Sequence, residues 1–256
     1  MKKYILDCVV VANIPLNKRY FLLRVSHPHP FPRMLPGQFV ELRVDNSSDV
    51  LLRRPISIHD MNYETNEMDL LVQIVGAGTL KMSELKKGDL LNMIAPLGNS
   101  FSMPTIDMKH VLLVGGGVGV APLLLLGRVL QQYSCKVSFL LGARTASDLV
   151  QLDSFSQYGE VYLTTEDATV GEKGFVTNHP LLKNKVFDKI YTCGPTPMMK
   201  AISAYAKTNN IECEVSLENT MACGFGVCLC CVTDTTEGHK CVCTEGPVFN
   251  LTTLKW

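Results

Sequence analysis

Six of the ten cysteines in this 256-residue chain lie between Cys223 and Cys243. Cys223, Cys228 and Cys231 have the spacing C-x4-C-x2-C, and eleven residues separate Cys231 from Cys243. This spacing, with a distant fourth cysteine, is typical of plant-type [2Fe–2S] sites. Two irons each need two thiolates, so a tight loop supplies three ligands and a remote segment supplies the last. We therefore expect the tail to fold around an iron–sulfur cluster.

Two further cysteines, Cys230 and Cys241, compete for the third and fourth ligand positions. The x2 spacing favours Cys231 as third ligand, whereas spacing alone leaves the fourth ligand open. Gly224 and Gly226 would let the loop backbone approach the cluster and point amide N–H groups at its sulfurs. The alternative is a zinc site, since four cysteines also bind zinc. Zinc sites usually combine two C-x2-C elements, and only one is clear here.

Charge and hydropathy exclude several classes of protein. The chain has 24 basic and 24 acidic residues, with no clustered Lys/Arg stripe, which argues against a nucleic-acid or anionic-membrane surface. No stretch reaches the roughly 18 apolar residues that a membrane helix needs. Lys2 and Lys3 precede an apolar run, but Asp7 interrupts it and no cleavage site follows, so we expect a first β-strand. Without a secretory signal, the cytoplasm is the expected compartment, where clustered thiols stay reduced.

The pattern of the chain changes near residues 100 and 215. Up to about residue 95, six short apolar or alternating runs with turn residues between them predict an antiparallel barrel or sandwich. After Pro104, strand patterns alternate with helical patterns, which predicts a parallel sheet with helices on both faces. The expected domains are residues 1–100, 101–215 and 216–256.

Two glycine turns lie at predicted strand ends. The sequence LLVGGGVGVAP places four glycines between residues 115 and 119, where helix N-terminal amides would meet a diphosphate. It lacks the full G-x-G-x-x-G pattern, and a tight turn packed for its own sake is the alternative. A second turn, in YTCGPTPMM, again follows a strand, at the edge where open α/β sheets bind ligands.

In the first domain, Arg54-Pro55-Ile56-Ser57 places an arginine and a hydroxyl where they could clamp a diphosphate. Alone, this would be an edge strand with a surface arginine. The order RPIS, VGAGT, GGGVGVAP and CGPTPMM, however, resembles the ferredoxin–NADP reductase superfamily over residues 1 to 215. Ile56 stands where that superfamily often has a flavin-stacking aromatic.

With Ile56 at this position, the chain resembles the electron-transfer subunits of two-component, NAD-dependent dihydroorotate dehydrogenases, whose barrel carries RPIS. The tail, SLENTMACGFGVC followed by VCTEGPVF, resembles the cluster domain of the same subunits. In that family the last cluster ligand precedes an acidic-Gly-Pro-Val-Phe stretch, which here selects Cys243. The resemblance implies an FAD-binding antiparallel barrel, a parallel-sheet nucleotide-binding domain and a small C-terminal [2Fe–2S] module.

Site residues follow by position from this resemblance. The RPIS group would hold the ribityl and diphosphate of FAD. Residues 71–73 would contact the edge of the flavin ring, and residues 78 and 79 would contact the phosphate. The full FAD set is Arg54, Pro55, Ile56, Ser57, Leu71, Val72, Gln73, Gly78 and Thr79. The NAD set is Gly115, Gly116, Gly117, Gly119, Cys193, Gly194 and Pro195. The cluster ligands would be Cys223, Cys228, Cys231 and Cys243.

The implied activity is electron transfer between NAD(H), FAD and the cluster, with no acid–base catalytic residue. The chain has no site resembling one for dihydroorotate, so the family implies an FMN-containing catalytic partner of pyrimidine biosynthesis, in a heterotetramer of two subunits of each kind. The alternatives are a reductase subunit of a sulfide dehydrogenase, an NADH-dependent ferredoxin reductase or a cytosolic hydrogenase, or, in another class, a zinc-stabilised nucleotide-binding module without redox activity. The family points to NADH, although Arg144 after the second α/β strand could meet a 2′-phosphate.

Overall fold

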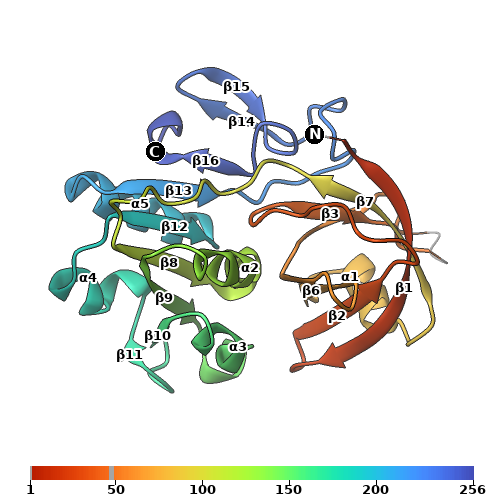
Figure 1. Cartoon of the computed structure of the whole chain (residues 1–256), viewed down its shortest axis with the longest axis horizontal. Helices are drawn as coiled ribbons and strands as arrows, with labels where there is room; N and C mark the ends of the chain where they lie inside the picture. The colour runs from red at the N-terminus through yellow and green to blue at the C-terminus, as the bar shows by residue number, and fades with distance from the viewer. Residues whose placement is uncertain (1, 46–48) are drawn as a thin grey trace.

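The computed structural model describes residues 2–45 and 49–256, and it divides into two large sheets and a small hairpin (Figure 1). One seven-stranded sheet is antiparallel and curls into a half-open barrel. The other seven-stranded sheet is parallel except for its last pair of strands. The predicted fold class, a barrel followed by an α/β domain and a cysteine-rich module, is confirmed.

The barrel has the strand order β4-β3-β7-β1-β2-β6-β5, and its neighbouring strands all run antiparallel. Alternate side chains of β1, such as Cys8 and Val10, are fully buried inside it, as the period of a half-buried strand requires. Its elements are β1 (Tyr4–Pro15), β2 (Tyr20–Ser26), β3 (Phe39–Leu42), β4 (Arg54–Ser57), β5 (Asp60–Asn62), β6 (Glu67–Gln73), α1 (Ala77–Ser83) and β7 (Leu90–Leu97).

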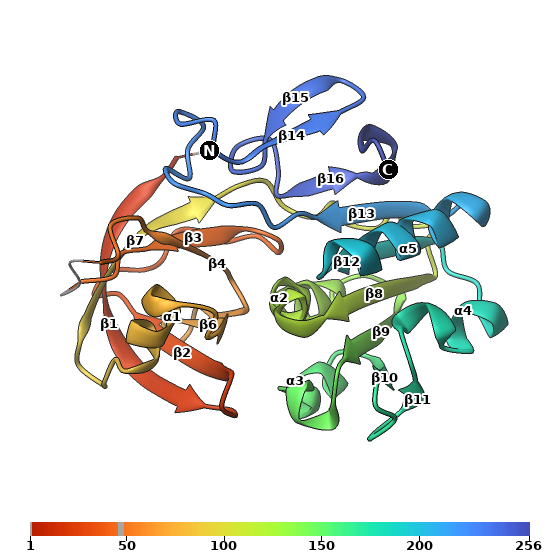
Figure 2. The same ribbon diagram turned by 180° about the vertical axis from the view of Figure 1, so that it is seen from behind.

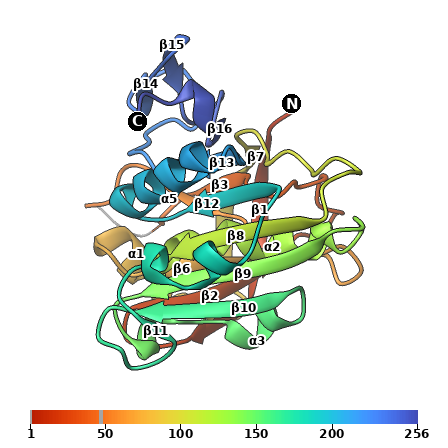
Figure 3. The same ribbon diagram turned by 90° about the vertical axis from the view of Figure 1, so that its left-hand side faces the viewer.

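The parallel sheet has the order β11-β10-β9-β8-β12-β13-β16. Helices α2 and α3 cover its barrel-facing side, and α4 and α5 cover the other (Figures 1 and 3). The predicted parallel sheet with helices on both faces is thus confirmed. Its elements are β8 (His110–Gly116), η1 (Gly117–Val120), α2 (Ala121–Leu130), β9 (Lys136–Ala143), η2 (Ala146–Asp148), α3 (Leu152–Ser156), β10 (Glu160–Thr165), β11 (Glu172–Lys173), η3 (Val176–Asn178), α4 (Leu181–Asn184), β12 (Lys189–Cys193), α5 (Thr196–Thr208) and β13 (Glu212–Ser216).

The cysteine-rich tail returns to this sheet. After the hairpin of β14 (Val232–Thr235) and β15 (Gly238–Cys241), strand β16 (Val248–Asn250) pairs antiparallel with β13, and η4 (Leu251–Thr253) follows (Figure 2). Phe249 and Leu251 join the apolar core beneath α5, together with Cys231 and Cys243. The tail is therefore anchored on the parallel sheet rather than held by metal ligands alone.

The barrel and the α/β domain each contribute side chains to the hydrophobic core of the other. Leu125 of α2 packs into the barrel core, whereas Leu22 of β2 and Leu71 of β6 pack into the core between α2 and the parallel sheet. These side chains are 5% exposed or less, so the junction of barrel and α/β domain is itself a hydrophobic core. Within residues 2–45 and 49–256, none of the helices has the length and apolarity to cross a membrane.

Candidate functional site

A cavity of about 550 Å³ lies between the barrel and the carboxyl edge of the parallel sheet. The barrel contributes Arg19, Tyr20 and Gln73 to its wall. The sheet contributes the turns and loops after β8, β9, β10 and β12, including Arg144 and Glu166. The carboxyl ends of parallel strands are where α/β sheets bind nucleotides. Five of the seven predicted NAD residues line this cavity: Gly116, Gly117, Gly119, Gly194 and Pro195.

The two glycine turns meet backbone to backbone. Strands β8 and β12 are neighbours with Gly115 beside Cys193, which brings their carboxyl ends together. A Cβ atom on Gly119 would lie 2.6 Å from Cys193 O, and one on Gly194 would lie 3.0 Å from Gly116 N. Glycine is required here because any side chain would separate the turns. The conformation of Gly117, with φ +57, is also one that glycine adopts readily.

The remaining predicted NAD residues lie beneath the cavity wall. Gly115 packs under Val120 and Leu123. Cys193 is 1% exposed, and its thiol donates a hydrogen bond of 3.9 Å to Glu218 Oε1. Because Glu218 lines the cavity, Cys193 is connected to the nucleotide space through it.

On the barrel, the open edge of β6 fits a flat ring. Strand β5 pairs with β6 only through Glu67–Asp69, and Asp69 O accepts from His59 N at 2.9 Å. Backbone groups of alternate residues point the same way in an antiparallel strand, so those of Leu71 and Gln73 also point away from β2. The side chains of Leu71 and Val72 are 1% and 0% exposed. A flavin ring would therefore meet this strand through main-chain N–H and C=O groups and through Gln73.

The RPIS strand and the start of α1 form a candidate phosphate-binding site on the barrel. A Cβ atom on Gly78 would lie 2.6 Å from Arg54 Nε, so the arginine occupies the space above this glycine. Arg54 Nη1 donates to the carbonyls of Leu52 and Arg53, and no carboxylate of the described residues forms an ion pair with it. Thr79 Oγ1 accepts from Val75 N at 2.9 Å and so fixes the turn. This leaves an arginine and the first amides of α1 suited to phosphate oxygens.

The four predicted ligands of the cluster gather in two pairs. The thiol of Cys223 lies beside that of Cys228, and the thiol of Cys231 lies beside that of Cys243. Cys243 N also donates to Cys231 Sγ at 3.4 Å. Two pairs of thiolates are what two irons require. In the described part of the chain, no three His, Cys, Asp or Glu side chains are grouped closely enough to hold a single metal ion.

Main-chain amides of the loop point at the cysteine sulfurs. Phe225 N donates to Cys223 Sγ at 3.5 Å. Burial raises the pKa of Cys223, but hydrogen bonds from the amides of Phe225, Cys228 and Val227 outweigh it and lower that pKa to about 6. Such donors favour the thiolate, which is the form that binds metal. The residues present therefore fit a [2Fe–2S] cluster.

The two extra cysteines lie differently. Cys230 is exposed, whereas its neighbour Cys231 is 2% exposed. Cys241 is half-buried in β15, and its amide donates to Glu245 Oε2 at 2.7 Å. Cys243 is 1% exposed, and its thiol lies near the amide of Gly226. These contacts favour Cys231 and Cys243 as third and fourth ligands.

The barrel touches the cysteine loop at a buried carboxyl group. Glu41 on β3 is fully buried, and neither carboxylate oxygen has a hydrogen-bond partner. A Cβ atom on Gly224 would lie 2.7 Å from Glu41 Cγ. Across β3 and β4, Glu41 is in register with Pro55 of the RPIS strand. The predicted flavin strand and the predicted cluster loop are thus one strand apart.

Sequence reasoning missed several residues of these sites. Tyr20, Glu166 and Glu218 line the cavity, and Glu41 lies under the cysteine loop. Glu166 follows directly on β10, and an acidic residue at a strand's carboxyl end is a signal that could have been followed. Nothing local marks Tyr20 or Glu41, which read as ordinary strand residues.

Comparison with known proteins identifies the families to which three parts of the chain are similar. The sequence matches three domain families: an oxidoreductase FAD-binding domain over residues 7–101, an oxidoreductase NAD-binding domain over residues 113–204, and the iron–sulfur cluster binding domain of dihydroorotate dehydrogenase B over residues 218–255. The chain is therefore an oxidoreductase with FAD, NAD and iron–sulfur cluster domains, and the zinc module without redox activity is not supported.

Relatives extend the match over the whole chain. The dihydroorotate dehydrogenase B (NAD(+)) electron transfer subunit of Fusobacterium nucleatum is 36% identical over 253 residues, which cover 95% of each chain. That of Bacillus velezensis is 40% identical over 84% of each chain.

Two solved structures share the fold. An NADH-dependent reduced ferredoxin–NADP oxidoreductase has a TM-score of 0.88 and 30% identity, covering 97% of this chain and 90% of that one. The FAD/NAD-binding domain of a nitric oxide dioxygenase from Vibrio cholerae, at 18% identity, has a TM-score of 0.69, covers 82% of this chain and 98% of that one, and shows the fold alone. With these relatives and the three matched domains, the chain belongs to the family of dihydroorotate dehydrogenase B electron transfer subunits.

Proposed function

We propose that this chain connects NAD(H) in the cavity to a separate dihydroorotate dehydrogenase catalytic subunit, through FAD on the barrel and a [2Fe–2S] cluster in the tail. When bound, FAD exchanges two electrons with a nicotinamide and single electrons with an iron–sulfur cluster, and this chemistry belongs to the cofactor. The protein's own contribution is to bind these groups, orient them and keep them in order.

One observation carries the proposal: the predicted flavin positions lie between the cavity and the cysteine loop. Gln73, at the end of β6, lines the cavity on one side. Glu41, the register partner of Pro55, lies against Gly224 on the other. Strands β4 and β6 are in contact, so one small part of the barrel faces both neighbours. A nicotinamide, a flavin and a cluster would occupy consecutive positions along this line.

Residue roles follow from this arrangement. Arg54 and the first amides of α1 hold the FAD diphosphate, and the edge groups of Leu71 and Gln73 fix the ring. The paired turns at Gly116–Gly119 and Gly194–Pro195 hold the dinucleotide against it. Cys223, Cys228, Cys231 and Cys243 hold the cluster.

The partner is an FMN-containing catalytic subunit, and the complex contains two subunits of each kind in the cytoplasm. The family name of the relatives supports the partner, because an electron transfer subunit implies a second subunit that binds dihydroorotate. Light scattering of the co-purified complex measures its mass, and a mass other than two plus two contradicts the stoichiometry.

A second acceptor is favoured by a specific observation. The structure with a TM-score of 0.88 is that of an NADH-dependent reduced ferredoxin–NADP oxidoreductase, so a ferredoxin-type partner is the rival. Reduction of added ferredoxin at a rate exceeding dihydroorotate-coupled turnover would favour this rival.

An anaerobic titration of the purified chain with NADH tests the proposal. We expect the visible spectrum of flavin plus [2Fe–2S], with both components bleaching and the paramagnetic signal of a reduced cluster appearing. A protein that purifies without iron and sulfide, or whose flavin does not respond to NADH, would overturn it.

A further inference from the structure

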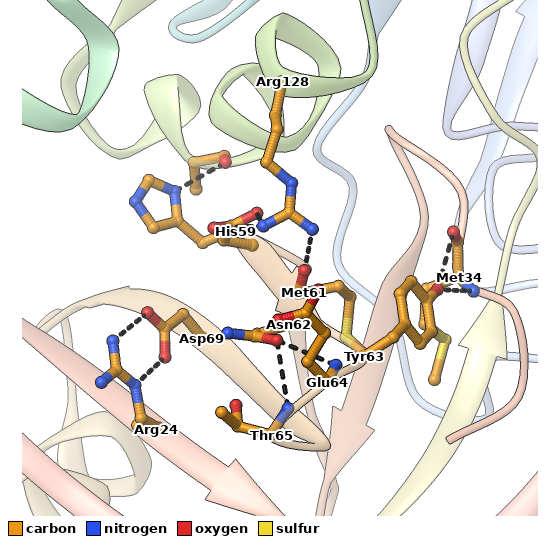
Figure 4. Close-up of polar contacts among 12 residues, drawn as sticks. Arg24, Met34, His59, Met61, Asn62, Tyr63, Glu64, Thr65, Asp69 and Arg128 are labelled. Carbon is orange, nitrogen blue, oxygen red and sulfur yellow. Dashed lines mark hydrogen bonds and ion pairs between the residues drawn. The ribbon is translucent and has the colours of Figure 1, made fainter. Parts of the chain in front are cut away.

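Three consecutive barrel residues hold the helix that follows the first glycine turn. His59, Asp60 and Met61 contact α2 through Ala121, Leu125 and Arg128. These helix residues are spaced i, i+4 and i+7 and so form one stripe along α2. Figure 4 shows the polar contacts of His59, Met61 and Arg128 at this junction.

His59 contacts two backbone groups of α2, the carbonyl of Ala121 and the amide of Leu125, which are the pair that an i→i+4 hydrogen bond would join. Its ring Nδ1 lies 2.8 Å from Ala121 O, and its main-chain O accepts from Leu125 N at 3.0 Å. Its own N–H donates to Asp69 O of β6 at 2.9 Å. One residue thus ties the strand with the open edge to the first turn of the helix.

The contact at Ala121 fixes the tautomer of His59. A carbonyl oxygen only accepts, so Nδ1 carries a proton. Burial lowers the pKa of His59 and so favours the neutral ring, in which Nε2 is unprotonated. The residue is 1% exposed, Nε2 is buried without a partner, and the ring packs edge-on against Phe155 of α3 at 6.2 Å. The ring is therefore held from α2 and α3 at once, in one orientation.

Neighbouring contacts stiffen the same junction. Arg128 Nη1 lies 3.0 Å from the carboxylate of Asp60, and Arg128 Nη2 donates to Met61 O. Leu125, between Ala121 and Arg128 on the stripe, is 3% exposed and packs into the barrel core. A charge pair and a buried leucine thus continue the contact that His59 begins.

The junction connects two walls of the nucleotide cavity. Helix α2 begins directly after η1, whose Gly117 and Gly119 line the cavity. Opposite them, Gln73 stands four residues after Asp69 on the same strand, β6. A shift of α2 against β6 would move one wall of the cavity relative to the other.

We propose that His59 is a positioning residue for electron transfer from NADH: through Asp69 on one side and Ala121 and Leu125 on the other, it sets the separation between the flavin strand and the glycine turn. The inference rests on the proposed function, which places nicotinamide and flavin on these two walls. Misplacement of reacting groups by about 1 Å can lower a rate by about a hundredfold, so a small shift of α2 is sufficient to be measured.

Three variants of the FAD- and cluster-loaded protein test this. His59→Ala removes the ring. His59→Asn places an amide N–H near the position of Nδ1 and keeps the bond to Ala121, whereas His59→Gln places it near Nε2 and does not. His110→Ala is the matched control, because that half-buried ring bonds Ser138 at 2.9 Å at the far end of β8.

Two quantities are measured at equal FAD content. The first is the limiting rate of flavin bleaching at saturating NADH, together with the half-saturating NADH concentration. The second is amide hydrogen exchange of residues 121–130 without nucleotide, a readout independent of activity. We expect His59→Ala and His59→Gln to lower the limiting rate about tenfold and to speed exchange, with the half-saturating concentration changed by less than about threefold. His59→Asn should stay within about threefold of the parent protein, and His110→Ala should match it.

Equal limiting rates in the Asn and Gln variants would overturn the inference, and so would a parent-like rate in His59→Ala. If His59→Ala loses FAD, the Asn and Gln pair decides. Loss of FAD from both of these would assign His59 a purely structural role and also contradict the inference. A parent protein whose flavin NADH does not reduce would instead contradict the proposed function.

Discussion

Gly119 and Gly194, 75 positions apart in the sequence, pack so closely that a Cβ atom on Gly119 would lie 2.4 Å from Gly194 Cα. The two turns that contain them thus form one surface beneath the nucleotide cavity. A side chain on either glycine would push the backbones of the two turns apart.

Gly119→Ala should therefore weaken nucleotide binding without displacing FAD. The added methyl group meets backbone atoms, which cannot rotate away, and overpacking of this kind costs about 1–3 kcal/mol. We expect the dissociation constant for NAD+ to rise about tenfold or more in isothermal titration. Unchanged NAD+ affinity at full FAD occupancy would contradict the place given to this turn.

The fourth cluster ligand can be identified by comparing variants of Cys241 and Cys243, which are two residues apart. Cys243→Ser should lose the cluster, because the buried sulfur that meets Cys231 and the Gly226 amide is gone. Cys241→Ser should keep it. Iron and sulfide content with the visible spectrum decides, and the reverse pattern would make Cys241 the ligand.

Thiol reactivity tests the third ligand. Burial raises the pKa of Cys8 and of Cys213 to about 12, so at pH 8 both stay protonated, and both are shielded. Cys230 is exposed and is not one of the proposed cluster ligands. Iodoacetamide should label Cys230 first in the loaded protein, with Cys8 and Cys213 unlabelled by peptide mass spectrometry. Protection of Cys230 until the cluster is removed would show it to be a ligand.

Nucleotide preference should depend on two charges in the cavity wall. Glu166 and Arg144 both line the cavity at neighbouring strand ends, and a carboxylate repels a 2′-phosphate whereas a guanidinium attracts it. Glu166→Gln should lower the ratio of kcat/KM for NADH over NADPH by about tenfold, and Arg144→Ala should raise it. A ratio unchanged by both variants would place the adenosine ribose elsewhere.

The sequence predicted those parts of the fold that depend on local pattern. Alternation in residues such as Cys8 and Val10 predicted the barrel strands, and the glycine turns marked the carboxyl ends of β8 and β12. The pairing of β16 with β13 could not be predicted, because residues 248–250 are too few to show a period and their partner lies far along the chain.

In the candidate site, too, the features that depend on local sequence pattern were predicted and those that depend on the fold were not. Cysteine spacing identified the metal loop, since ligand geometry restricts spacing directly. Glu41, Glu218 and His59 were not predicted, because each acts through a neighbour that only the fold supplies: Gly224, Cys193 and Ala121. Spacing favoured Cys231 over its neighbour Cys230, but it left Cys241 and Cys243 open as the fourth ligand, because the difference in their burial comes only from the fold.

The most direct test of the electron path is dihydroorotate-dependent reduction of NAD+ by this chain combined with its catalytic subunit, comparing the parent chain with Cys228→Ser. We expect NADH to form only when both subunits are present, and the Cys228→Ser variant to lose this activity while NADH still reduces two-electron dyes through FAD. Unchanged coupled activity in a Cys228→Ser protein shown to lack its cluster would contradict the proposed order of carriers.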